Sequence, residues 1–383
     1  MNPIANPTPT EVPVPTRTVP FRRSLLLAGA LVLAVLAAAC SSSGDTAGSG
    51  GTAPGGSAPS GGVVRLVTHD SFNVSDSVLA EFTAETGIEV EVLRQGDAVA
   101  MVNTAILTKE NPQGDVLFGV DNNTVTRALD EGLFAPHAAV GLDRVPDDLE
   151  LDPEGRVVPV DVGDVCLNYD VEYFATSGVA PPTELEDLTD PAYRDLLVVE
   201  NPATSTPGFA FLLATIATFG EDGGGWQAYW SALRENGVQV TDGWEEAYIG
   251  AFSGGSGEGD RPIVVSYASS PPYEVANAET PPAEAPTKVV ESSCFRQIEL
   301  AGVLANAANP TGAQLLVDFL LSDTFQADIP EQMYVYPVVE GTPLPESFTA
   351  YASVPTGSLS MPAEEIGANR DAWVEAWTTT VLR

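Results

Sequence analysis

The sequence predicts an α/β protein with two hinged lobes, whose sheets are mostly parallel. From residue 63 onward, short β-branched runs alternate with amphipathic stretches, which is the pattern of parallel βαβ units. Two long extended stretches, 156–169 and 288–300, flank a central α/β block. We therefore expect these two stretches to be the paired crossovers between the lobes. The length of 383 residues is sufficient for two lobes of ordinary domain size.

Three strand–helix pairs are expected at the start of the folded body. In the first predicted helix, the spacing of Val78, Leu79 and Phe82 places their side chains on one face, and Gly87 provides a helix end. The expected elements are a strand at 63–69, a helix at 77–86, a strand at 88–93, a helix at 98–109, a strand at 115–120 and a helix at 124–131.

A second alternating set follows the first extended stretch. Its expected elements are a strand at 196–200, a helix after Pro207, a helix at 226–236, a strand at 238–241, a helix after Trp244 and a strand at 262–267. Helices are also expected at 310–325 and 369–382. As domains, we expect residues 63–160 to form the first part of lobe 1 and residues 161–293 to form lobe 2. Residues 294–383 would return to lobe 1 and supply the C-terminal helices.

Residues 1–39 have the features of a signal peptide. Arg22 and Arg23 precede an apolar run at 25–39, which is shorter than the ~20 residues of a membrane-spanning helix and ends in small side chains. Cys40 follows at the position where bacterial lipoproteins carry the cysteine that is lipidated after cleavage. The arginine pair also fits a twin-arginine signal, so export by the Sec or the twin-arginine route is expected. A membrane anchor without lipid is the alternative.

A Ser- and Gly-rich stretch follows the lipidated cysteine. Residues 40–62 have the composition of a flexible linker. The expected layout is an extracytoplasmic folded body that is tethered to the cell membrane through a lipid on Cys40.

The charge of the chain excludes nucleic acid as a partner. The formal net charge is −37, with 16 Lys and Arg against 53 Asp and Glu. Such a chain repels phosphate backbones and attracts cations. The alternative explanation is that the acidity does no more than keep an exported protein soluble.

Two cysteines remain in the folded body once Cys40 is assigned to the lipid. Outside the cytoplasm, Cys166 and Cys294 are expected to form a disulfide. Because each lies in one of the two extended stretches, the bond would join the crossovers in the hinge region. Two free buried thiols are the alternative.

No motif of a known catalytic or metal site is present. The sequence lacks a Walker-type phosphate loop, the Gly-x-Ser-x-Gly pattern of hydrolases and a His-Glu-x-x-His zinc motif. The run Asp121-Asn122-Asn123 lacks the spacing and the final Glu of a calcium loop. These absences narrow the range of functions, and we expect no cofactor and no metal.

Aromatic and small polar residues gather instead where predicted strands end. Ligands of open α/β sheets bind at the carboxyl ends of the strands, although the same residue types also serve as turns and helix caps. The segments are His69-Asp70-Ser71-Phe72, Asp121-Asn122-Asn123, Thr241-Asp242-Gly243-Trp244 and Ser266 through Pro271. In addition, Thr204 to Gly208 reads as a helix start, whose free N–H groups suit an anion such as phosphate.

From residue 63 to residue 383 the chain resembles the thiamine-binding proteins of bacterial ABC importers. The segments that carry the resemblance occur in order and at family spacing. They are His69 to Phe72, Gly119 to Asn123, Asn201-Pro202 with Thr204 to Gly208, Thr241 to Tyr248, Ser266 to Pro271 and Tyr336-Pro337-Val338. The resemblance implies a two-lobed periplasmic-binding-protein-like fold of type II, which closes on a ligand and performs no catalysis. It departs at His69, where relatives carry an aromatic residue, and at Tyr334 or Tyr336, where a second stacking tryptophan is expected.

The same resemblance implies a set of ligand contacts and partners. The implied partners are thiamine or a thiamine phosphate, the ABC permease and ATPase subunits, and the membrane through the lipid anchor; the protein is expected to be a monomer. Stacking on aromatic rings would hold the flat rings of thiamine, and Asp97 would balance its positive charge or accept from its exocyclic amine. The Ser205-Thr206 helix start would hold a phosphate ester, or the terminal hydroxyl of a ligand without phosphate. The implied ligand-binding residues are Asp97, Ala98, Ser205, Thr206, Trp244, Tyr267, Ala268, Ser269, Ser270, Pro271, Tyr273 and Tyr334.

Two alternative functions remain open from the sequence. The first is capture of another small solute: ferric iron, which usually requires clustered tyrosines, or a polyamine, held by several carboxylates together with aromatic residues. The carboxylates available for a polyamine are Asp97, Asp121, Asp242 and Glu245. The second is a thiaminase-like or other surface enzyme on the same fold. Such an enzyme needs a nucleophile, usually a cysteine, and a free thiol at Cys166 would favour it.

Overall fold

The computed structural model describes residues 62–278, 280, 282–353 and 355–383. The predicted signal peptide, the lipidation site at Cys40 and all but the last residue of the predicted linker lie outside the described residues. Within those ranges, we find no helix whose length and apolar character would let it cross a membrane.

A nine-stranded sheet runs through the described part of the chain. Its strand order is β2-β1-β3-β8-β4-β7-β5-β6, with β9 beside β4. We call the part built on β1 to β3 lobe 1 and the part built on β5 to β7 lobe 2. The strands are β1 (Gly62–Thr68), β2 (Ile88–Arg94), β3 (Val116–Asp121), β4 (Val158–Asp170), β5 (Leu197–Glu200), β6 (Gln239–Thr241), β7 (Ile263–Tyr267), β8 (Thr287–Val303) and β9 (Tyr336–Pro337).

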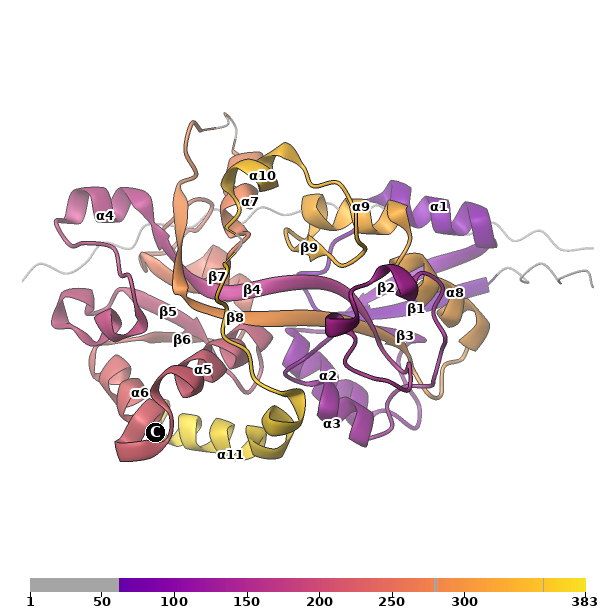
Figure 1. Cartoon of the computed structure of the whole chain (residues 1–383), viewed down its shortest axis with the longest axis horizontal. Helices are drawn as coiled ribbons and strands as arrows, with labels where there is room; N and C mark the ends of the chain where they lie inside the picture. Colours follow the sequence, from indigo (N-terminus) through magenta and orange to yellow (C-terminus); the bar gives the residue numbers. More distant parts are fainter. Residues whose placement is uncertain (1–61, 279, 281, 354) are drawn as a thin grey trace, which may run out of the picture. The chain divides into compact units, whose positions relative to one another are not determined.

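The parallel and antiparallel strand pairs have different places in this sheet. Within lobe 1, β1 pairs in parallel with β2 and β3, and within lobe 2, β5 pairs in parallel with β6 and β7. The long strands β4 and β8 pair with each other antiparallel along most of their length and run side by side between the lobes (Figure 1). This confirms that the two extended stretches are paired crossovers. The pairs of β8 with β3 and of β4 with β7, which attach the crossovers to each lobe, are also antiparallel.

Helices cover both faces of the sheet in lobe 1, with α1, α8 and α9 on one face and α2 and α3 on the other (Figure 1). The helices are α1 (Asp76–Thr86), α2 (Ala98–Leu107), α3 (Val125–Asp130), α4 (Val171–Ser177), α5 (Thr206–Phe219), α6 (Gly225–Glu235), α7 (Ser270–Ala276), α8 (Pro310–Leu320), α9 (Asp323–Gln332), α10 (Glu346–Tyr351) and α11 (Ala363–Val381). A π-type helix, η6, covers Glu246–Ala251, and short 3₁₀ turns η1 to η5 cover Leu142–Arg144, Asp147–Leu149, Leu185–Thr189, Pro191–Tyr193 and Asp222–Gly224.

The core of lobe 2 surrounds α5. Every residue of this helix from Thr206 to Ile216 is buried, as its apolar composition on all sides requires. The C-terminal helix α11 adds Ile366, Trp373 and Trp377 to this core, whereas α8 and α9 belong to the core of lobe 1. The part of the chain after residue 294 therefore contributes to both lobes.

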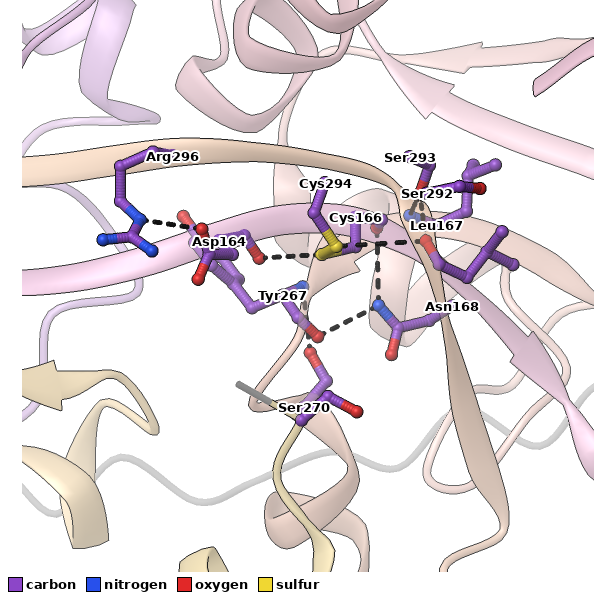
Figure 2. The surroundings of a disulfide bond; sticks show 12 residues. Asp164, Cys166, Leu167, Asn168, Tyr267, Ser270, Ser292, Ser293, Cys294 and Arg296 are labelled. Atoms are coloured by element: carbon purple, nitrogen blue, oxygen red, sulfur yellow. Dashed lines mark hydrogen bonds and ion pairs between the residues drawn. A yellow bond between two sulfur atoms is a disulfide. The ribbon is translucent and has the colours of Figure 1, made fainter. Parts of the chain in front are cut away.

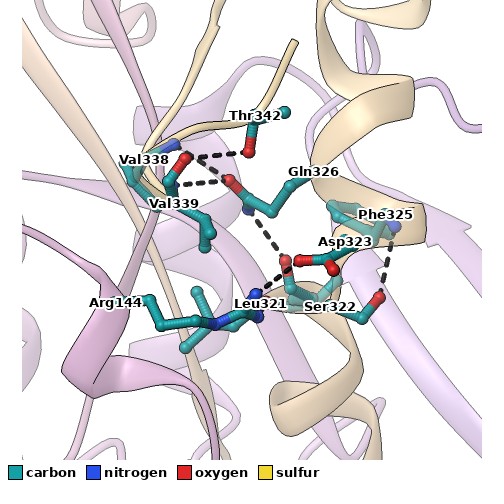
Figure 3. A network of polar contacts seen from close by, with 10 residues as sticks. Arg144, Leu321, Ser322, Asp323, Phe325, Gln326, Val338, Val339 and Thr342 are labelled. Carbon is teal, nitrogen blue, oxygen red and sulfur yellow. Dashed lines mark hydrogen bonds and ion pairs between the residues drawn. The ribbon is translucent and has the colours of Figure 1, made fainter.

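The predicted helix at 310–325 is wrong, because the structure contains two helices there. Helix α8 ends at Leu320, and the Ser322 hydroxyl caps the new helix α9 by accepting from the Phe325 N–H at 3.2 Å. Buried Gln326 then joins three segments, and Figure 3 shows its contacts with Val338 and Val339. Its amide nitrogen donates to the carbonyls of Val160 and Leu320, both at 2.9 Å. Its oxygen accepts from the N–H groups of Val338, at 2.9 Å, and Val339, at 3.1 Å.

A disulfide joins the crossovers, as predicted. Cys166 of β4 and Cys294 of β8 are bonded, with a Cα–Cα distance of 4.2 Å and a sequence separation of 128 (Figure 2). Both cysteines are buried against Ala268. Because Cys166 is also the register partner of Ser266 in β7, the bond lies where three strands meet.

Candidate ligand-binding site

A cavity of about 700 Å³ opens between the two lobes at the carboxyl ends of their parallel strands. Lobe 1 contributes the segment after β1, the start of α2 and the segment after α9. Lobe 2 contributes the start of α5, the segment after β6, the end of β7 and part of α7. The volume lies within the usual range for small-molecule sites, and the carboxyl edge is where α/β sheets bind ligands.

Trp244 forms the main aromatic surface of this cavity. Its indole stacks on the ring of Tyr248, with a centroid distance of 5.0 Å and an interplanar angle of 15°. Its ring N–H donates to the hydroxyl of Ser266 at 2.9 Å. The indole is therefore fixed at its face and at its edge, and it presents a rigid flat surface to a ligand.

Ser266 belongs to a short chain of hydroxyls behind the cavity wall. Its oxygen lies 2.8 Å from that of Ser270. The Ser270 hydroxyl accepts from the Tyr267 N–H at 3.1 Å (Figure 2). The ring of Tyr267 lies against Gly163 of β4. A Cβ at Gly163 would lie 2.9 Å from the tyrosine Cδ1, so glycine is needed for this close approach.

Asp97 connects the two lobes at the edge of the cavity. As the N-cap of α2 in lobe 1, its carboxylate accepts from the Ala98 N–H at 2.7 Å. It also accepts from two N–H groups of lobe 2, those of Thr206 at 3.2 Å and Trp244 at 3.1 Å. Burial raises the pKa of Asp97 above its usual value, although these two amides and the nearby His69 oppose the rise.

A row of three carboxyl groups crosses the sheet beneath the cavity. Glu299 of β8 lines the cavity and is the register partner of Asp121 in β3 and of Asp161 in β4. Burial, and then the charge of Glu299, raise the pKa of Asp161 well above its usual value. Burial raises the pKa of Asp121 to about 7, against hydrogen bonds from Thr124 and Asn123.

His69 lies next to this row. Its Nε2 atom is 3.2 Å from a carboxylate oxygen of Glu299. Burial lowers the pKa of His69, but the carboxylates of Glu299, Asp97 and Asp70 outweigh that effect, so its pKa is raised. A Cβ at Gly119 would lie 2.7 Å from the imidazole, and this residue has a φ of +104°, so glycine makes room for the ring.

The segment after α9 closes the lobe 1 side. Met333 and Val335 line the cavity, and the Gln326 amide holds this part of the chain in place from behind. Tyr334, between them, packs edge-to-face on Tyr273 with a centroid distance of 5.0 Å. Tyr334 therefore supports a wall residue and is not itself part of the lining.

Five of the twelve predicted ligand-binding residues line the cavity: Asp97, Thr206, Trp244, Tyr267 and Tyr273. The other seven lie behind its wall or beside it. Ala98 is buried in α2, Ser205 is fully buried before α5, and Ala268 packs on the disulfide. Ser269 and Ser270 are buried, Pro271 borders a different, smaller cavity, and Tyr334 supports Tyr273.

Sequence reasoning missed several residues of the lining, above all Glu299 and Met333. Glu299 lies within the long strand β8, where no strand end or turn draws attention to it. Glu245, which also lines the cavity, is one of the carboxylates that the polyamine alternative named. In the described residues, no group of three or more His, Cys, Asp or Glu is arranged to hold a metal ion.

The comparisons with known proteins agree with this geometry. Residues 111–356 match a family described as bacterial extracellular solute-binding protein. The chain is 32% identical over 330 residues to the thiamine-binding periplasmic protein of Brucella suis biovar 1 (strain 1330), covering 83% of this chain and 92% of that protein. It is 31% identical over 326 residues to the protein of that name from Escherichia coli (strain K12), covering 84% and 94%. A solved periplasmic thiamin binding protein superposes with a TM-score of 0.73 at 29% identity, covering 84% of this chain and 96% of that one.

Proposed function

Since this chain belongs to the family of bacterial extracellular solute-binding proteins, we propose that it captures thiamine outside the membrane and delivers it to an ABC importer. The observation that carries the proposal is the cavity between the lobes. It combines the fixed indole face of Trp244 with a lining rich in carboxylates, in a chain related over most of its length to thiamine-binding proteins.

The two rings of thiamine match these two features of the cavity. The flat aminopyrimidine and the cationic thiazolium both stack on aromatic faces, and a cation over such a face gains about 0.5–2 kcal/mol. Trp244 and Tyr267 offer those faces. Glu299 supplies a negative charge from the floor, and since it lies 8% exposed, solvent screens it little. The ligand would thus be held by stacking and by charge together.

Asp97 stabilises the closed arrangement of the two lobes by bonding across the cavity edge. Its carboxylate holds the start of α5 and the Trp244 segment to lobe 1, and the Ala100 N–H adds a bond to the Thr204 carbonyl at 3.1 Å. Opening of the hinge about β4 and β8 would break these contacts and expose the cavity. A ligand that bridges the two walls favours the closed form because it contacts both lobes.

We also propose that the protein works as a monomer held at the membrane by a lipid on Cys40, after export by the Sec or twin-arginine route. Its partners would be the permease and ATPase subunits of the importer. We propose no catalytic activity for this protein. Cys166 and Cys294 are bonded to each other, so neither supplies the thiolate that a thiaminase-like reaction needs.

Isothermal titration of the purified protein with thiamine tests the proposed function. We expect sub-micromolar binding of thiamine and no saturable heat with spermidine or ferric citrate at the same concentrations. Binding of spermidine or ferric citrate without thiamine binding would preserve the solute-binding role and overturn the ligand assignment.

Thiamine affinity should increase about tenfold between pH 6 and pH 8. His69, which faces Glu299, Asp97 and Asp70, loses its positive charge as pH rises through its raised pKa. Asp121, which faces Glu299, gains a negative charge as pH rises through its pKa of about 7. Both changes make the cavity more negative, so a bound cation is favoured at higher pH. Titrations in buffers of different ionisation heat would also detect proton release on binding.

The variant His69→Gln serves as the control for this pH dependence. It removes one titrating group and leaves Asp121 and Asp161, whose pKa values burial raises, so the slope of affinity against pH should become shallower without reversing. Affinity that is constant or that falls with rising pH in the unmodified protein would contradict the proposed electrostatics.

A further inference from the structure

A buried carboxyl group of lobe 2 is joined to the cavity wall through Tyr248. Glu274 of α7 is 5% exposed and lies outside the lining of the cavity. Its carboxylate accepts from the Tyr248 hydroxyl at 2.7 Å, from the Ser256 N–H at 2.7 Å and from the Ser256 hydroxyl at 3.0 Å. Hydrogen bonds to a carboxylate are charge-assisted and are stronger than those between neutral groups. Glu274 therefore holds the outer end of the Tyr248 side chain firmly in place.

The hydroxyl of Tyr248 keeps its proton and is the donor in this bond. Burial, and then the charge of Glu274, raise the pKa of Tyr248 well above its usual value. Burial also raises the pKa of Glu274, although the bonds from Tyr248 and Ser256 oppose the rise. Since the Tyr248 ring is fully buried and its hydroxyl does not ionise at neutral pH, the phenol is a fixed donor to Glu274.

The backbone that carries Tyr248 is itself irregular, because this residue lies in the π-type helix η6. Such helices are rare, occur as single turns and are frequent at functional sites. The loop at 253–261 returns along η6 and completes part of its hydrogen bonding, since the Glu258 N–H donates to the Ile249 carbonyl at 2.8 Å. Helix η6 is thus supported by the same loop that bonds to Glu274.

Glycine is required where this loop passes over Glu274 and η6. Gly255 has a φ of +59°, and a Cβ at this position would lie 2.2 Å from the carboxyl carbon of Glu274. A Cβ at Gly259 would lie 2.0 Å from the Ala251 carbonyl oxygen. The loop is consequently packed against both elements. Glu274 is the residue at which α7, this loop and the Tyr248 side chain are joined.

We propose that Glu274 is a positioning residue for ligand binding, which acts through Tyr248 on the indole of Trp244. The ring of Tyr248 stacks on this indole with a centroid distance of 5.0 Å and an interplanar angle of 15°, so a displaced Tyr248 ring would displace the indole. Ser266 holds only the N–H edge of the indole. This role rests on the proposed function, because it concerns how a wall residue of the same cavity is held. A wall that is held less firmly binds its ligand more weakly.

Titration of Tyr248→Phe with thiamine tests this role, because the variant removes one hydroxyl and retains the ring. We expect the affinity to fall about fivefold, the size expected for the loss of one hydrogen bond. Glu274→Met removes the acceptor of the same bond and should lower the affinity at least about fivefold, provided that circular dichroism shows an intact fold. Glu274→Gln retains an oxygen that can accept from Tyr248, so it should restore the affinity to within about twofold.

The matched control is Tyr229→Phe. Tyr229 is also buried in lobe 2, outside the lining, and its hydroxyl donates to the Leu185 carbonyl at 2.9 Å. The control variant therefore loses the same kind of hydrogen bond in the same lobe. Its midpoint of thermal unfolding should fall as in Tyr248→Phe, whereas its affinity for thiamine should equal that of the unmodified protein.

Repeating the Tyr248→Phe substitution in the Trp244→Ala variant distinguishes positioning of the indole from a general loss of stability. Without the indole, the substitution should leave the remaining affinity unchanged to within about twofold. The same fivefold loss with and without the indole, or an unchanged affinity in Tyr248→Phe alone, would overturn the role of Glu274 and leave the proposed function intact. Absence of thiamine binding by the unmodified protein would overturn the proposed function itself.

Discussion

Replacement of Trp244 by alanine should weaken thiamine binding about 100-fold, which corresponds to ~2.7 kcal/mol. The variant removes the aromatic face that stacks on the ligand and leaves a gap above Tyr248, on which the indole rests. Loss of one well-packed aromatic anchor at the centre of a site typically has an effect of this size. Isothermal titration of the variant at pH 7.5 provides the measurement, with thermal unfolding to confirm that the fold is intact.

Phenylalanine variants separate the roles of the indole face and the indole N–H. Trp244→Phe retains a flat ring but loses the hydrogen bond to Ser266, so we expect a loss of only about five- to tenfold. Trp373→Phe is the matched control. Trp373 lies in α11, outside the cavity, and its ring N–H also donates to a side chain, that of Glu221. Its affinity should equal that of the unmodified protein. An equal loss of thiamine affinity in the two phenylalanine variants would indicate that Trp244 affects binding only through the stability of the fold.

The sequence was a good guide to the parts of the site that follow strands. Trp244 and Tyr267 come directly after or at the end of β6 and β7, so the rule that ligands bind at the carboxyl ends of parallel strands identified them. The paired crossovers were also predictable, because their two stretches are long and extended, and β4 and β8 are the longest strands among the described residues. The disulfide followed from the two cysteines left in an exported chain, and their places in the two extended stretches located it between the crossovers.

The floor of the cavity could not be predicted in the same way. Glu299, Asp121 and Asp161 are far apart in the sequence and meet only through the register of β8 with β3 and β4. Register depends on which strand pairs with which, and the sequence of one strand does not contain that information. The charge of the floor therefore became visible only in the folded chain.

The residues after β7 show a different limit of sequence reasoning. Small polar residues such as Ser270 suit a ligand contact and a supporting hydrogen bond equally well. In the structure, Ser270 accepts from the Tyr267 N–H and lies beside the Ser266 hydroxyl, so it positions two wall residues from behind. Similarly, the apolar run across residues 310–325 hid a helix end, although Ser322 and Asp323 are typical of a new helix start.

The double variant Cys166→Ser, Cys294→Ser should lower the free energy of unfolding by about 4 kcal/mol. The bond closes a loop across a sequence separation of 128, and the chain-entropy model assigns loops of this length about 4–5 kcal/mol. For a folded body of this size the midpoint of thermal unfolding should fall by roughly 5–6 °C. Calorimetry of the variant, compared with the unmodified protein after reduction, provides the measurement. Similar losses in both would show that the covalent link, and not the serine side chains, is responsible.

Thiamine affinity of the same variant should change less than about threefold at 25 °C. The strand pairs of β4 with β7 and β8 continue on both sides of the bond, and Ser266, which holds Trp244, keeps its place through the register of β7 with β4. The disulfide would then act mainly by limiting the unfolded chain, whereas the strand pairs maintain the site. A large loss of affinity with little loss of stability would contradict this division. It would mean that the bond itself holds the Tyr267–Ala268 segment, which packs on the two cysteines, in the binding position.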